Sequence, residues 1–113
     1  MDNDLYLEIQ QKQKELDVSI KSLRKTGQAK AEKERDYKIL LSTEALKLRE
    51  QNMPVGMIDK VVYGLPNVAK ARFERDMAEV VYSANMDAIN SIKLQIRILD
   101  AQLDREWSRA GSV

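Results

Sequence analysis

The sequence from Ala78 to Leu103 reads AEVVYSANMDAINSIKLQIRILDAQL, and its apolar residues recur at alternating steps of four and three. This heptad spacing predicts a helix that packs lengthwise against other helices. One polar residue, Asn85, interrupts the pattern; it either sets register and oligomeric state or is tolerated at a bundle edge. We predict that an oligomer core is formed by the residues at the repeating positions: Ala78, Tyr82, Asn85, Ile89, Ile92, Ile96, Leu99 and Leu103.

The composition of the 113-residue chain fits a protein of long helices, with 33% charged and 5% aromatic residues. The 19 basic and 18 acidic residues nearly cancel, so no overall field directs the chain to nucleic acid or to a membrane surface. No run approaches the roughly 18 apolar residues of a membrane span, and the acidic start is unlike a signal peptide. We therefore expect a cytoplasmic protein without a membrane partner.

Helix-breaking residues divide the chain into two long helices and a connector. The first helix is expected over about residues 4–51, where there is no proline and one glycine. A connector over 52–66, with a short amphipathic helix, leads to a second long helix over about 67–109. Helices joined by a short link fold back antiparallel, so we predict a single all-α helical hairpin over residues 1–113. Candidate helix-start residues are Asp2, Asn3 and Asp4 for the first helix, and Pro66 or Asn67 for the second.

Gly27 lies in the weakest part of the first helix, where no large apolar residue occurs. It marks a thin spot in a continuous helix, a break, or a close crossing where small residues let two backbones approach. Folding the chain about residue 58 or 59 places Gly27 opposite Ala88–Ser91 and Leu48 opposite Ala69. The small residues in Ala88–Ser91 favour the close crossing.

The second helix carries more apolar surface than one partner helix covers. An apolar arc this wide is usually buried by several helices, so we predict a homodimer forming a four-helix bundle, or a higher oligomer. The residues of the second apolar face are Phe73, Met77, Val80, Val81, Ala84 and Ala88, and Leu94 and Ile98 form another.

Catalytic constellations are missing from the sequence. It contains no histidine and no cysteine, which removes the commonest general base, the thiolate nucleophile and the usual transition-metal ligands. The four glycines are scattered and form no phosphate-binding loop. We therefore expect no enzymatic activity, no cofactor and no metal site.

Two stretches are candidates for binding. The apolar connector either caps the open end of the hairpin or binds a partner, and Trp107 either closes the opposite end against Leu5 and Ile9 or anchors an interface. The possible partner patch consists of Met53, Val55, Met57, Val61, Tyr63 and Trp107. Possible nucleic-acid contacts come from a stretch without acidic residues and are Lys21, Arg24, Lys25 and Lys30.

Three segments, within Asp36–Val55, Ala71–Glu79 and Asp104–Trp107, resemble small helical coiled-coil proteins of bacteriophages and prophages of Gram-positive bacteria. Those proteins are commonly uncharacterised and non-enzymatic, and the resemblance implies action in the host cytoplasm on a host or phage protein. We therefore predict a phage-type accessory protein that acts by protein–protein binding as a helical homo-oligomer. The alternatives are an oligomeric nucleic-acid-binding accessory protein and a scaffold-like helical assembly protein.

Overall fold

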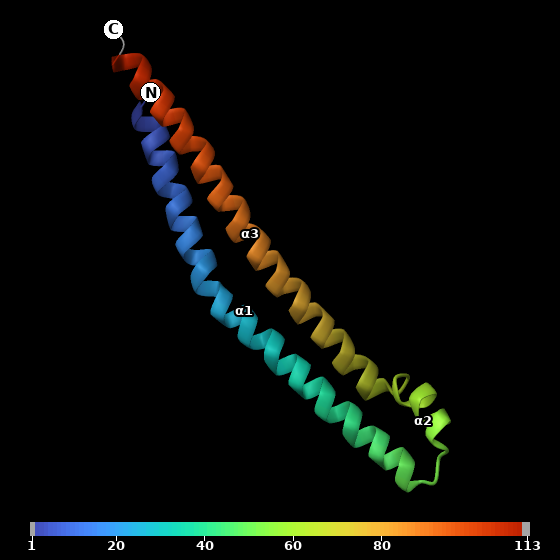
Figure 1. The fold of residues 1–113 in the computed structure, drawn as a ribbon. Helices are drawn as coiled ribbons and strands as arrows, with labels where there is room; N and C mark the ends of the chain where they lie inside the picture. Colours follow the sequence, from blue (N-terminus) through green and yellow to red (C-terminus); the bar gives the residue numbers. More distant parts are fainter. Residues whose placement is uncertain (1, 112–113) are drawn as a thin grey trace. The chain divides into compact units, whose positions relative to one another are not determined.

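The computed structural model describes residues 2–111 and contains, in that range, helices and no strand (Figure 1). Helix α1 spans Asp2–Glu50, α2 spans Val55–Val62 and α3 spans Pro66–Gly111. The expected order of long helix, short helical connector and long helix is therefore confirmed. Pro66 is the first residue of α3, where its missing N–H costs no helical hydrogen bond. Asp4 lies inside α1 instead of capping it, and the side chains of Asp2 and Asn3 are outside the described residues.

The end of α1 shows how the sequence stops a long helix. Asn52 adopts a left-handed conformation with φ of 63°, which asparagine tolerates better than most residues. The Asn52 N–H donates to the Arg49 carbonyl at 3.0 Å, and the Met53 N–H donates to the Leu48 carbonyl at 3.2 Å. This pair of bonds is the Schellman motif, which satisfies carbonyls that a helix end leaves without partners. Pro54 follows and cannot continue the helix.

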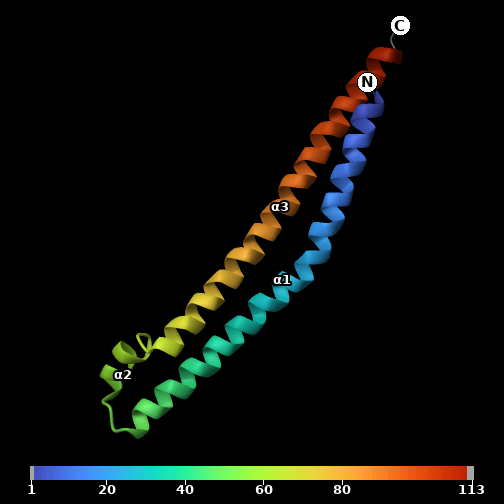
Figure 2. The ribbon, with the colours of Figure 1, turned by 180° about the vertical axis from the view of Figure 1, so that it is seen from behind.

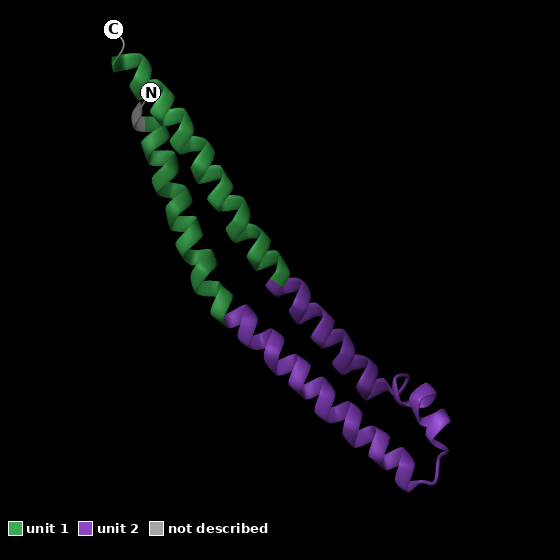
Figure 3. Cartoon of the chain, in the orientation of Figure 1, with its two compact units in different colours: residues 1–24, 83–113 green, residues 25–82 purple. Residues whose placement is uncertain are grey.

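The chain forms two compact units, shown in Figure 3. Unit 1 combines residues 1–24 and 83–113, and unit 2 consists of residues 25–82. In unit 1 the Asn85 Nδ2 donates to the Ser19 carbonyl at 2.9 Å. In unit 2 the Asn67 Nδ2 donates to Glu44 Oε1 at 3.2 Å, and Lys33 Nζ lies 3.5 Å from Glu74 Oε2. In unit 2, early α3 residues thus meet late α1 residues, so the two helices run antiparallel there, as the ribbon of this unit shows (Figure 2).

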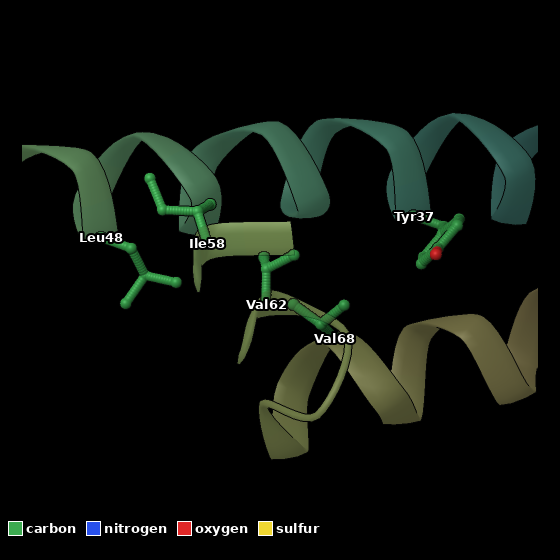
Figure 4. Packing of buried hydrophobic residues seen from close by; sticks show 5 residues of the cluster. All are labelled: Tyr37, Leu48, Ile58, Val62 and Val68. Carbon is green, nitrogen blue, oxygen red and sulfur yellow. The ribbon is translucent and has the colours of Figure 1, made fainter. Parts of the chain in front are cut away.

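The main core lies in unit 2, where α2 meets the two long helices (Figure 4). Ile58 and Val62 of α2 pack with Leu48 of α1 and with Val68 of α3, whose side chain is fully buried. Tyr37 completes this cluster. The core of unit 2 is enclosed by three helices, because the apolar side of α2 packs against both long helices. In unit 1 the buried apolar residues of the described part are Leu5, Ile9 and Ile89.

The register between the long helices differs from the prediction. Gly27 faces Tyr82 and not Ala88–Ser91, and in unit 2 α3 begins beside Glu44 and not beside the last turn of α1. The prediction treated the connector as a symmetric turn. In the structure, α2 packs against the last turns of α1 through Ile58, so α3 starts farther back along α1.

Gly27 does not break α1, which is helical throughout this region. A Cβ atom added at Gly27 lies 3.5 Å from Tyr82 Cε2. The glycine therefore lies against a tyrosine ring from α3, and not against the small residues expected at a close crossing.

Candidate binding surfaces

The predicted connector patch is divided between the core and the surface. Met53 and Val61 are partly buried against the core cluster of unit 2. Val55 and Met57 are 71% and 52% exposed, and Tyr63 is 45% exposed. Ile58 and Val62 of α2 therefore cap this end of unit 2, whereas Val55, Met57 and Tyr63 present apolar surface to solvent. A role of these exposed residues in partner binding stays a prediction.

A shallow groove in unit 2 lies between α2 and α1. Val55 and Ile58 line it from α2 together with Asp59, and four α1 residues complete it: Ser42, Ala45, Leu46 and Arg49. Leu46 is itself 55% exposed. Its lining thus combines apolar side chains with one basic residue, Arg49, and one acidic residue, Asp59.

The residues of the predicted oligomer core, which we call the seam, lie on the side of α3 that packs against α1 of the same chain. In unit 2, Tyr82 packs on Gly27, and Ala78 is partly buried. In unit 1, Ile89 is 4% exposed, and Asn85 bonds the Ser19 carbonyl of α1. The remaining seam residues, all partly buried, are Ile92, Ile96, Leu99 and Leu103. The seam thus packs inside one chain, and its part in contacts between chains stays a prediction.

A charged and aromatic section of unit 2 was not found from the sequence. The Arg75 guanidinium carbon lies 4.4 Å from the centre of the Tyr37 ring, and Lys30 Nζ lies 4.7 Å from the Tyr82 ring. Cations over tyrosine faces are attracted by the ring quadrupole. Arg75 Nη2 also lies 2.9 Å from Asp76 Oδ1, and its Nε lies 3.8 Å from Glu34 Oε2.

The charge on Arg75 is fixed by these neighbours. Its hydrogen bond to Asp76 is the main cause that raises the pKa of the guanidinium above its ordinary value, and the charge of Glu34 acts in the same direction. The signal for this section was present in the sequence, because Arg75 precedes Ala78 by three residues and so continues the heptad spacing. An arginine at a seam position needs acidic or aromatic partners across the interface.

Of the four predicted nucleic-acid contacts, three are exposed and one is partly buried. Lys21, Arg24 and Lys25 are exposed on α1 and make no ion pair within residues 4–111. Lys30 is partly buried over Tyr82 and so belongs to the contact with α3. Three of the four predicted nucleic-acid contacts are therefore available for phosphate groups.

Trp107 does not close the end of unit 1, because its side chain is 64% exposed. The heptad spacing explains this exposure. Three residues after Leu103 the seam position falls on Glu106, which is partly buried, so the neighbouring Trp107 turns away from the seam.

Within the part of the chain that the structure describes, no three Asp, Glu, His or Cys side chains gather where they would hold a metal ion. Among the helices of that same part, none is both long and apolar enough to span a bilayer.

The sequence matches no protein-family model, no curated protein and no solved structure.

Proposed function

We propose that the chain is a non-enzymatic accessory protein that works as a helical homo-oligomer and binds another protein through the exposed apolar residues of the connector, in α2 and just after it. The observation that carries this proposal is the exposure of Val55, Met57 and Tyr63, the first of them by 71%. Large exposed apolar side chains concentrated in one short segment are candidates for an interaction site, and methionine adapts to irregular partner surfaces.

The resemblance to helical phage and prophage proteins supports a host or phage protein as the target, with action in the host cytoplasm. The groove between α1 and α2 fits a helical or extended segment of that protein. Arg49 and Asp59 at its rim would select a segment that carries both signs of charge.

The test is capture of partners from a host-cell lysate by the tagged protein, with nuclease added. We expect a discrete protein whose recovery falls at least tenfold with Met57→Glu, because this change places a charge in the apolar contact. Val18→Glu is the matched control, since Val18 is also exposed, by 64%, but lies in unit 1. Circular dichroism checks that both variants keep their helicity. Equal recovery with both variants would contradict the proposed surface.

A second candidate function is nucleic-acid binding, which is supported by the exposed charges of Lys21, Arg24 and Lys25, since none of them has an ion pair within the described residues. Binding through phosphate contacts weakens with salt at a slope of about −0.9 per contact on duplex DNA. We expect the triple change to glutamate to abolish retention on DNA, whereas Lys30→Gln has little effect because Lys30 contacts Tyr82. Retention of the triple variant at the wild-type level would exclude this function.

A further inference from the structure

The middle of α1 contains no buried side chain. Between Ile9 and Tyr37 every residue of the helix is partly buried or exposed. The two leucines of this stretch are partly buried, and Val18 and Ile20 are 64% and 47% exposed. Most of the stability of a helix in a protein comes from the packing of its apolar side against other elements. The middle of α1 therefore depends on its own backbone hydrogen bonds more than the parts that contain buried residues.

Residues 22–29 add backbone features that weaken this middle part, and we call them the weak segment. Gly27 lies within it, and glycine is, after proline, the least favourable residue in a helix interior. At its start the Ser22 Oγ donates to the Val18 carbonyl at 3.0 Å, a contact that slightly destabilises a helix and often bends it. The boundary between the two compact units crosses α1 inside the weak segment, after Arg24. Burial, backbone hydrogen bonding and the division of the chain thus indicate the same place.

Polar contacts with α3 lie on either side of the weak segment. On its N-terminal side the Asn85 Nδ2 donates to the Ser19 carbonyl at 2.9 Å, and on its C-terminal side Lys30 Nζ lies 4.7 Å from the centre of the Tyr82 ring. Both contacts hold α1 outside the segment and do not require residues 22–29 to be helical. The segment can therefore lose its helical hydrogen bonds while these contacts, and the buried residues beyond them, stay in place.

We propose that α1 opens locally at the weak segment while both ends of the helix remain packed. In the opened form the N–H groups of residues 22–29 bind water, and the peptide bonds after Arg24 and Lys25 become accessible to proteases. Local opening needs less free energy than global unfolding when no buried side chain has to leave a core. The opening is a property of one helix and does not require the partner binding of the proposed function.

Amide hydrogen exchange of the intact protein, resolved by NMR, is the first test. Relative to their rates in the unfolded chain, amides of residues 22–29 should exchange at least tenfold faster than those of residues 38–48, which lie beside the core of unit 2. Low urea concentrations should change exchange in the weak segment little, because a local opening exposes little surface, and should accelerate exchange in residues 38–48. Equal protection in the two ranges, or equal sensitivity to urea, would overturn the proposal.

Trypsin provides the second test, because the 19 lysines and arginines are spread along the chain and cleavage follows the population of the opened form. Within α1, the cut after Lys25 should precede the cuts after the exposed Lys38 and Lys47. Gly27→Ala should slow the cut after Lys25 about fivefold, because alanine favours the helix by about 1 kcal/mol. An earlier cut after Lys38 or Lys47, or a cut after Lys25 that Gly27→Ala does not slow, would overturn the proposal.

Ser42→Gly is the matched control for the effect of glycine alone. It places a glycine between Tyr37 and Leu48, which are both buried in the core of unit 2. Packing on both sides should keep the lysines of this region more resistant to trypsin than Lys25. Cuts in this region as fast as at Lys25 would show that a glycine alone causes the opening, and the missing buried residues would then have no part in it.

Discussion

Unit 2 and unit 1 contain parts of the same two long helices but differ in what packs against them. In unit 2, α2 adds a third side, and the cluster of Tyr37, Leu48, Ile58, Val62 and Val68 forms a small core. In unit 1, the two long helices meet without a third element, and buried Ile89 alternates with half-buried seam residues and with the Asn85–Ser19 hydrogen bond. Two helices packed along a heptad seam thus bury single residues such as Ile89, whereas the third helix gathers the buried residues of unit 2 into one cluster.

The sharpest test of this difference is Val68→Asp in unit 2. Val68 is fully buried, so the change places an unpaired charge in the core and should cost more than about 3 kcal/mol of unfolding free energy. Urea unfolding followed by circular dichroism measures the loss. Val55→Asp is the control, because Val55 is 71% exposed and should change stability little. Similar losses for the two variants would show that α2 does not enclose a core.

A smaller effect is expected for Ile89→Ala in unit 1. Removing these buried methyl groups should cost about 2–4 kcal/mol through lost burial and the cavity left behind. Hydrogen exchange should show that amides of unit 1 lose protection while those of α2 keep it. If the amides of α2 lost as much protection as those of unit 1, both units would unfold in one cooperative step. The two units would then differ in packing but not in stability.

Substitutions of Asn52, at the end of α1 in unit 2, should change the free energy of unfolding by about 1–2 kcal/mol. Asn52 has a φ of 63°, a conformation that costs a residue with a Cβ roughly this amount unless it is asparagine or aspartate. Asn52→Ala should therefore lower the unfolding free energy, and Asn52→Gly should leave it equal or higher. Thermal unfolding of the two variants side by side provides the measurement. A fall with glycine as large as with alanine would indicate that the asparagine side chain, and not the backbone, holds the turn.

The smallest expected effect is a gain. Gly27→Ala should raise the unfolding free energy by up to about 1 kcal/mol, because alanine favours the helix and its Cβ meets Tyr82 at an ordinary contact distance of 3.5 Å. Gly27→Leu should lower it, because the larger side chain displaces the tyrosine ring. If Gly27→Ala destabilised the protein instead, the two helix backbones would lie closer at Gly27 than the contact with Tyr82 indicates, as the predicted close crossing requires.

Periodicity made the architecture predictable. The steps of four and three from Ala78 to Leu103 identified the side of α3 that packs on α1, and Pro54 and Pro66 marked the connector within a residue or two. The register was not predictable, because it depends on how Ile58 of α2 packs on Leu48. Spacing along one helix contains no information about that contact.

The candidate surfaces were predicted less completely for a related reason. Apolar residues of α2 looked alike in the sequence, but only the three-dimensional packing shows that Val62 is buried and Met57 exposed. In the sequence Lys30 cannot be distinguished from its basic neighbours, whereas in the structure it lies over the Tyr82 ring. Residue type indicates what a side chain can bind, and its neighbours across the interface decide whether it is free to do so.

The exposed position of Trp107 has a spectroscopic consequence. It is the only tryptophan of the chain, and it already faces water in the folded state. Its fluorescence emission should therefore shift little when the protein unfolds, and fluorescence would misreport a folded sample as denatured. The emission of Trp107 should shift to shorter wavelength when a molecule covers that end of unit 1. The intrinsic fluorescence of the chain therefore reports on contacts at this end and hardly at all on folding.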